Sequence, residues 1–155
     1  MPAARHTAIA KATPNVLWEK LADLESWPRW VGVPWAAESV QLEATEKEEM
    51  LGAVVVFKGR LPYRLFATIT DWRPPRRLAF KIYRSEYPSD RLTFRWAEIS
   101  IELAEVDDRR TQVICKHVLL GKGPAGALYA ATIMRLFLKS NVQRMLDGLA
   151  AAVVR

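Results

Sequence analysis

The stretch TQVICKHVLLGKGPAG, residues 111–126, decides the fold together with the long apolar segment that follows it. Its odd-numbered residues from Val113 to Leu119 alternate with neighbours that include Gln112 and Lys116, and a period of two is typical of a strand with one buried face. The glycines of GKGPAG then end the strand. Residues 125–154 carry apolar side chains at steps of three and four, which predicts one helix of roughly 45 Å. The stripe comprises Met134, Leu138, Val142, Met145, Leu149 and Val153.

The residues before this strand predict a meander of antiparallel strands. From Ala36 to Leu120 the period is two, and short separators rich in Gly, Pro and Asp interrupt it. The predicted strands are 37–46, 53–58, 63–72, 77–84, 92–104 and 111–120. Such short links join antiparallel neighbours, and only the terminal helix is long enough to cover one face of the resulting sheet.

The N-terminal segment predicts one more strand and two short helices. Residues 5–12 alternate weakly, and Thr13-Pro14 then supplies an N-cap and a proline at the first helical position. The apolar stripe of this helix is Val16, Leu17, Leu21 and Leu24. A second short helix or turn is expected over residues 30–35, and we interpret the tryptophans of this region as the lid of the core: Trp18, Trp27, Trp30 and Trp35.

These elements predict an α+β protein in which a curved antiparallel sheet of about seven strands wraps around a long C-terminal helix. The chain contains no internal repeat and no Gly/Ser linker, so we expect a single domain over residues 1–155. A twisted sheet that closes around a helix leaves space at its concave face unless large side chains fill it.

Composition narrows the class of protein. Apolar residues make up 50% and charged residues 26% of the 155 residues, which is ordinary for a globular protein. No apolar stretch is long enough to span a bilayer, and residues 1–11 lack the apolar middle of a secretory signal, so a cytoplasmic location is expected. One cysteine and two histidines make a metal site improbable, and we expect no cofactor.

Charge is unevenly distributed along the chain. Residues 58–95 hold ten Lys/Arg against three Asp/Glu, whereas residues 38–50 hold five Glu and one Lys. The simpler interpretation is a pair of oppositely charged strand surfaces that keep sheet edges from aggregating. The alternative is a basic face for an anionic partner, which would bring six arginines together: Arg60, Arg73, Arg76, Arg77, Arg84 and Arg91.

The ordered pattern resembles the START/Bet v 1-like (SRPBCC) superfamily, specifically its polyketide cyclase/dehydrase and lipid-transport branch. The matching stretches run over nearly the whole chain: ATPNVLW (12–18), WPRW (27–30), GAVVVF (52–57), TDWRPPRRLAF (70–80), TQV (111–113) and GPAG (123–126). The resemblance implies the helix-grip fold and an internal cavity. Members bind lipids, sterols, polyketides, plant hormones or quinones, and some are enzymes, so fold alone does not set the function.

Strand alternation then selects the residues expected to line such a cavity. Most of them are apolar, as is usual in small-molecule pockets. The predicted ligand-binding residues are Phe57, Tyr63, Leu65, Ala67, Ile69, Phe80, Ile82, Cys115, His117, Leu119, Met134, Leu138 and Val142. A wall packed solidly by these same side chains is the alternative.

His117 is the most informative polar residue of this wall and a tentative catalytic residue. A neutral imidazole there could orient a ligand hydroxyl or act as a general base, or it could simply be a histidine that bonds to a neighbour. Tyr63, Tyr83 and Tyr129 are candidate donors at the rim. The face of Phe94, Trp96 and Glu98 stays open, because a β-bulge near Ala97 would turn them inward; an exposed Trp96 would instead suggest a dimer contact.

Three functions remain in order of preference. The first is a non-catalytic binder, and by extension a carrier, of a small hydrophobic molecule such as a lipid, polyketide or quinone. The second is an aromatic cyclase or dehydratase that uses the same cavity and needs a second ionisable group beside His117. The third is a protein that binds an anionic surface or nucleic acid through residues 58–95. A nucleic-acid partner is not expected, because exposed aromatics do not alternate regularly with the basic residues. A monomer and a homodimer both fit the sequence.

Overall fold

A computed structural model describes residues 3–27, 39–42, 50–58, 63–86, 94–133 and 139–152. Its strands form one antiparallel sheet in the order β1-β7-β6-β5-β4-β3-β2. The predicted meander is therefore confirmed, with the N-terminal strand added beside the last one. The strands are β1 (Ala3–Ala10), β2 (Ser39–Leu42), β3 (Val54–Lys58), β4 (Arg64–Arg73), β5 (Arg77–Ser85), β6 (Phe94–Asp107) and β7 (Arg110–Gly121).

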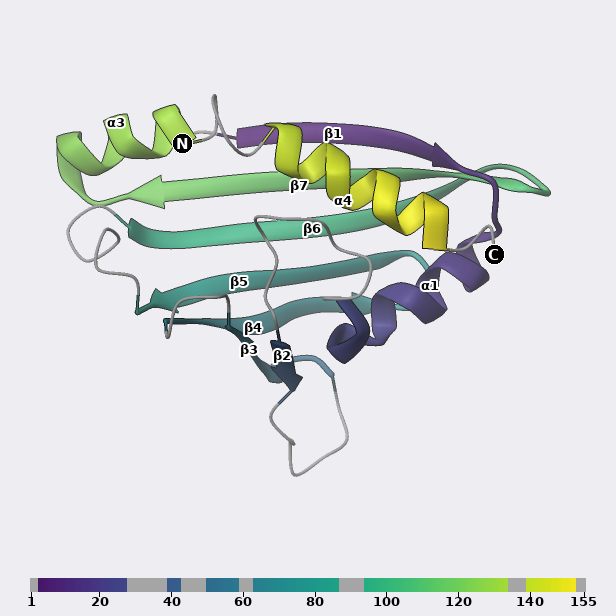
Figure 1. The fold of residues 1–155 in the computed structure, drawn as a ribbon, viewed down its shortest axis with the longest axis horizontal. Coiled ribbons are helices and arrows are strands. Elements are labelled where there is room, and N and C mark those ends of the chain that lie inside the picture. The colour runs from purple at the N-terminus through teal and green to yellow at the C-terminus, as the bar shows by residue number, and fades with distance from the viewer. Residues whose placement is uncertain are drawn as a thin grey trace.

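Helices occupy the segments before and after the meander. They are α1 (Pro14–Ala22), the 3₁₀ turn η1 (Leu24–Ser26), α3 (Gly123–Ile133) and α4 (Lys139–Ala152). Figure 1 shows α4 and α1 toward one end of the sheet and α3 at the other end, where β7 finishes. None of the described helices is both long enough and apolar enough to cross a membrane.

The start of α1 follows the predicted capping pattern. Thr13 is the N-cap, with its hydroxyl accepting a long hydrogen bond from the Val16 N–H at 3.5 Å, and Pro14 is the first helical residue. The predicted second helix over residues 30–35 lies outside the described residues. The short turn η1 instead follows α1 directly.

One position of the predicted α1 stripe is wrong. Leu17, Leu21 and Leu24 are buried, but Val16 is 43% exposed. Trp18 takes the inner position, because its ring packs edge-on against Trp72 with centroids 5.1 Å apart. Residues 17, 18, 21 and 24 lie on one side of a helix at 100° per residue, and residue 16 falls outside that arc.

The C-terminal region is described as two helices, which pack on different strands. Helix α3 contacts β7, and α4 contacts chiefly β1. Helix α3 begins at Gly123, two residues before the predicted start, because Pro124 falls in the first turn, where its missing N–H is not needed. The prediction of one helix over 125–154 includes residues 134–138 and 153–154, which lie outside the described part of the chain.

Only part of the predicted C-terminal stripe falls on described side chains. Leu149 is buried as predicted, and Leu146 is buried beside it. The side chains of Met134, Leu138, Val142, Met145 and Val153 lie outside the described part of the structure.

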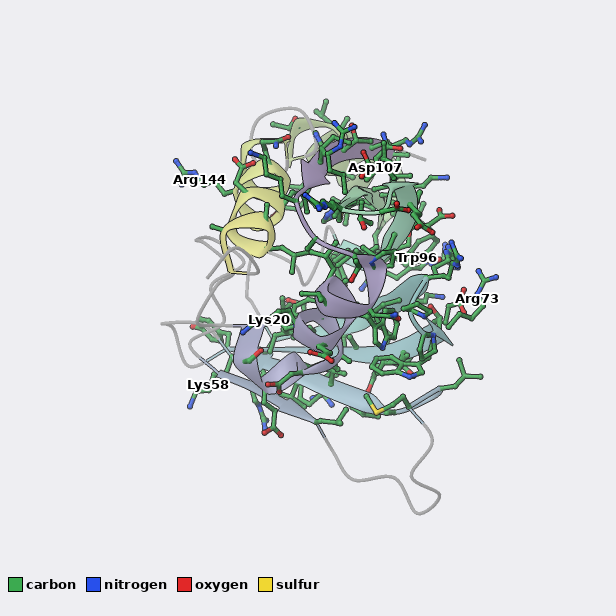
Figure 2. The ribbon with its side chains drawn as sticks, turned by 90° about the vertical axis from the view of Figure 1, so that its right-hand side faces the viewer. Lys20, Lys58, Arg73, Trp96, Asp107 and Arg144 are labelled. Atoms are coloured by element: carbon green, nitrogen blue, oxygen red, sulfur yellow. The ribbon has the colours of Figure 1, made fainter. Side chains whose placement is uncertain are left out.

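A register shift in β6 decides the faces that the sequence left open. The irregularity lies between Phe94 and Trp96, next to Ala97, so the bulge that the sequence allowed is present, but it turns only Phe94 inward. Phe94 therefore packs against the core, whereas Trp96 lies on the outer face with the Lys81 Nζ 4.9 Å from its ring centroid. Figure 2 shows Trp96 on the side of the sheet away from α4.

Candidate ligand-binding site

The inner face of the sheet carries the predicted wall. Eight of the predicted ligand-binding residues are at most 7% exposed, and two more, Tyr63 and Leu65, are half-buried. We call these eight the inner wall: Phe57, Ala67, Ile69, Phe80, Ile82, Cys115, His117 and Leu119. They come from β3, β4, β5 and β7, so four strands contribute to one surface. The predicted inward parity of these strands is confirmed by their burial, and a role in ligand binding stays a prediction.

The last strand supplies the polar part of this wall. Along β7, Thr111, Val113, Cys115, His117 and Leu119 are all buried. Thr111 is satisfied internally, because its hydroxyl donates to the Ala12 carbonyl at 2.7 Å. The other polar side chain of this face is the His117 imidazole. His117 pairs with an apolar residue on each neighbouring strand, Ile99 on β6 and Ala4 on β1.

His117 is held in its neutral form. Its side chain is only 4% exposed. Burial lowers its pKa to about 4, and the charge of nearby His6 lowers the pKa further in the same direction. At neutral pH the imidazole therefore carries one N–H donor and one acceptor nitrogen. A group of this kind can bind a hydroxyl or carbonyl, or accept a proton from a ligand.

His6 also lies on the inner face, and the sequence reasoning missed it. It lies on β1 with Cys115 as its Cα partner, two residues along the register from His117. Its side chain is half-buried, and the alternation of His6, Ala8 and Ala10 in the first strand is the signal that could have found it. The two histidines interact electrostatically, since His6 lowers the pKa of His117.

Cys115 faces His6 across the β1–β7 pair, and we expect its thiol to be unreactive in the folded protein. Its side chain is completely buried, and burial raises the pKa of its thiol to about 12. The thiolate is the reactive form. We therefore expect the native protein at neutral pH not to react with an aromatic disulfide reagent that releases a coloured thiolate. In denaturant the same reagent should detect one thiol per chain. Rapid stoichiometric labelling of the native protein would contradict this burial.

Two of the predicted rim donors, Tyr83 and Tyr129, differ in exposure. Tyr83 is 46% exposed beside a register shift of β5, whereas Tyr129 on α3 is half-buried.

The orientation of Glu98, which the sequence left open, follows from its neighbours. Glu98 lies between the inward residues Ala97 and Ile99, and its Cα partner on β5 is Lys81. Glu98 therefore belongs to the outer surface and is not an acid or base of the inner wall.

The two described tryptophans of the N-terminal region, Trp18 and Trp27, pack on the core as the predicted lid. Trp27 contacts Phe57 and Phe80 with ring centroids 6.4 and 5.9 Å apart. Its indole N–H donates to the Leu21 carbonyl at 3.0 Å. Trp30 and Trp35 lie outside the described residues.

The arginines of residues 58–95 do not gather into one patch in the described structure. Arg73 and Arg77 both bind Asp71, and their hydrogen bonds lower the pKa of that carboxyl. Arg84 lies near the other end of β5, 5.0 Å from the Phe66 ring centroid. Arg64 is held by Glu86 at 2.8 Å. Arg60 and Arg91 lie outside the described residues. Of the four described arginines of the predicted face, Arg73, Arg76 and Arg77 lie together at the β4–β5 turn, and Arg84 lies apart from them.

A depression of about 540 Å³ lies at the β6–β7 turn, away from the inner wall. Lys11 and residues 107–110 line it. Asp107 accepts from the Arg109 N–H at 2.9 Å and from the Arg110 side chain at 2.7 Å. These side chains are charged and exposed, so the depression does not match an apolar ligand. Among the described residues, no three His, Cys, Asp or Glu side chains are grouped to hold a metal ion.

Several solved structures are similar to this chain over nearly its whole length. An aromatase/cyclase named Zhui, from a Streptomyces species, is 16% identical over 99% of this chain and 94% of its own, with a TM-score of 0.78. A START superfamily protein from Mycobacterium smegmatis is 9% identical over 98% of this chain and 97% of its own, with a TM-score of 0.75. Ara h 8.0201 is 12% identical over 99% and 97%, with a TM-score of 0.74. These likenesses show the helix-grip fold.

The sequence itself supplies the family. No curated protein matches it. The family described as "Polyketide cyclase / dehydrase and lipid transport" matches residues 1–154. The chain therefore belongs to the polyketide cyclase/dehydrase and lipid transport family.

Proposed function

We propose that this protein binds a small hydrophobic molecule between the inner wall and the C-terminal helices. The observation that carries the proposal is a continuous apolar face from β3 to β7 that contains one buried, neutral imidazole. Apolar walls with a few placed polar groups are typical of small-molecule sites. In this proposal His117 orients the ligand through one hydrogen bond, and the apolar side chains supply the affinity. A lipid, a polyketide and a quinone all have this chemistry.

Native mass spectrometry of the purified protein tests the proposal, followed by extraction of any bound molecule. We expect a stoichiometric apolar ligand, or saturable binding from a panel of lipids, quinones and polyphenols. Ala67→Leu gives a sharper test, because Ala67 is fully buried in the inner wall. In an open cavity the larger side chain displaces ligand with little change in stability. In a solidly packed wall it costs about 1–3 kcal/mol through overpacking.

Thr68→Leu is the matched control, since Thr68 points to the opposite face of the same strand. It should leave ligand binding unchanged. A clean apo mass, no response to the panel and a strongly destabilised Ala67→Leu variant would together reject the proposal.

A cyclase or dehydratase is the second candidate, and His6 is the observation that favours it. That reaction class needs a second ionisable group close to the general base. His6 acts electrostatically on His117 from the neighbouring strand. An enzyme of this kind would convert the bound molecule with loss of water, and His117→Gln would stop the conversion while the ligand still binds. A bound ligand recovered unchanged after long incubation would favour the carrier.

A further inference from the structure

The outer face of the sheet carries two aromatic rings, one on β4 and one on β6. Phe66 and Trp96 are both half-buried. Their inward-facing neighbours Ala67 and Ala97 pair with the same residue of β5, Ile82. Because side chains alternate along a strand, the two rings lie on the opposite face, two strand spacings or roughly 10 Å apart. We call Phe66 and Trp96 the outer aromatic pair.

Three cations are held against these rings. The Cζ atoms of Arg64 and Arg84 lie 5.1 and 5.0 Å from the Phe66 ring centroid. The Lys81 Nζ lies 4.9 Å from the ring centroid of Trp96. Strand pairing fixes this arrangement, since Arg84 is the Cα partner of Phe66 and Lys81 lies on the same strand as Arg84. Rings and cations are thus brought together across β4, β5 and β6, so no alternation along one strand reveals them.

Two carboxylates lie near the outer aromatic pair and balance only part of this charge. Arg64 donates to both carboxylate oxygens of Glu86, at 2.8 and 3.2 Å, and Glu98 lies on β6 beside Lys81. Arg84 is exposed and forms no ion pair with a carboxylate of the described residues. Lys58 is also exposed, and it is the Cα partner of Arg64 on β3. Among the described residues of this region, four cations therefore accompany two carboxylates.

Aromatic rings, planar guanidinium groups and an excess of positive charge together fit a single-stranded nucleic acid. Bases stack on aromatic side chains and on guanidinium planes, while neighbouring cations hold the phosphates. Lys81 carries its charge on a flexible stem, so it can move from the ring to a phosphate when a base takes its place. A symmetric contact with a second copy fits less well, because it would bring these cations close to one another.

We propose that the outer face of β4, β5 and β6 binds single-stranded nucleic acid. Bases stack on the outer aromatic pair, the Arg84 guanidinium extends the stacking surface, and Lys58 and Lys81 contact phosphates. Stacking uses only the faces of the bases, so the site requires no particular base or sugar. Figure 2 shows Trp96 on the side of the sheet away from α4. Because the inner wall lies on the other face, this binding is independent of what the inner wall holds.

Fluorescence anisotropy with two labelled oligonucleotides tests this proposal. One is a single strand of twelve thymidines, and the other is an abasic strand with the same number of phosphates. We expect the thymidine strand to bind about tenfold or more tightly, because each stacked base contributes about that factor. Raising the salt concentration from 50 to 200 mM should weaken its binding about twentyfold if three phosphates are contacted.

Two variants separate stacking from charge. Trp96→Leu removes a ring but keeps an apolar side chain, so it should weaken binding of the thymidine strand about tenfold and leave the abasic strand unaffected. Arg84→Gln should weaken binding of both strands. Arg109→Gln is the matched control, because Arg109 is exposed at the β6–β7 turn, at the other end of β6, and loses the same charge. It should bind both strands like the wild type.

Circular dichroism checks that the three variants fold, and sedimentation without oligonucleotide measures self-association. Equal affinity of the wild type for the two strands would overturn the proposal, as would no binding of either strand. Equal losses from Arg84→Gln and Arg109→Gln would show attraction to the overall charge of the protein rather than to this face. A dimer that Trp96→Leu dissociates would assign the outer aromatic pair to a second copy of the chain.

Discussion

Replacing Trp27 with alanine is expected to lower the free energy of unfolding by about 3–5 kcal/mol, the usual range for a large aromatic residue removed from a core. Trp27 is 4% exposed, and its ring contacts Phe57 and Phe80. Alanine would leave a cavity beneath the N-terminal lid. It would also remove the donor that satisfies the Leu21 carbonyl, one of the last carbonyls of α1, which have no partner within the helix. Urea denaturation followed by circular dichroism measures the loss.

Trp96→Ala provides the comparison, because the same residue type is removed from the outer face. There the ring is half-buried, and the Lys81 ammonium lies over it, 4.9 Å from the ring centroid. An exposed cation–π pair contributes about 0.5–1 kcal/mol, so this variant should lose far less stability than Trp27→Ala. Equal losses in the two variants would show that Trp27 does not anchor the lid.

Acidification is expected to remove about 2–3 kcal/mol of stability through His117 alone as the pH falls from 7 to 4.5. In the folded protein the pKa of His117 is about 4, whereas an unfolded histidine titrates near 6.5. Between these values the unfolded chain binds a proton that the folded protein does not. Stability therefore falls as the pH drops below the unfolded pKa, and the loss is complete below the folded pKa.

His117→Gln isolates this contribution, because glutamine keeps a polar group but does not titrate. Urea denaturation of both proteins at several pH values gives two stability profiles, and the difference between them belongs to the imidazole. Arginine side chains lower the pKa of several carboxyl groups, Asp71 and Glu86 among them. Protonation of these groups in acid lowers the stability of both proteins equally, so it cancels in the difference. Parallel profiles over this range would contradict a buried neutral His117.

Much of the fold could be predicted because its signals are local. The strand of residues 111–120 shows its buried face through alternation alone, and Thr13-Pro14 marks a helix start through capping chemistry. The inner wall follows from the same alternation, since every strand residue that points inward is separated from the next by two positions. For this reason eight of the predicted wall residues are found buried.

Register shifts limited what alternation could decide. The irregularity between Phe94 and Trp96 reverses the faces of β6, and another between Ile69 and Asp71 lets Trp72 turn toward Trp18. A bulge adds one residue to one strand relative to its partner. Its position depends on how two strands pack, which neither strand shows alone.

The sequence by itself determined the class of fold, the inward faces of the regular strands and the importance of His117, because periodicity and capping act between residues close in the chain. Tertiary structure alone decided that His6 lies near His117 and that Trp96 and Glu98 face outward. It also decided that the described arginines of β4 and β5 form two groups, one at each end of this strand pair. Each of these depends on pairing between strands or on packing of a helix against a strand, and such contacts join residues far apart in sequence.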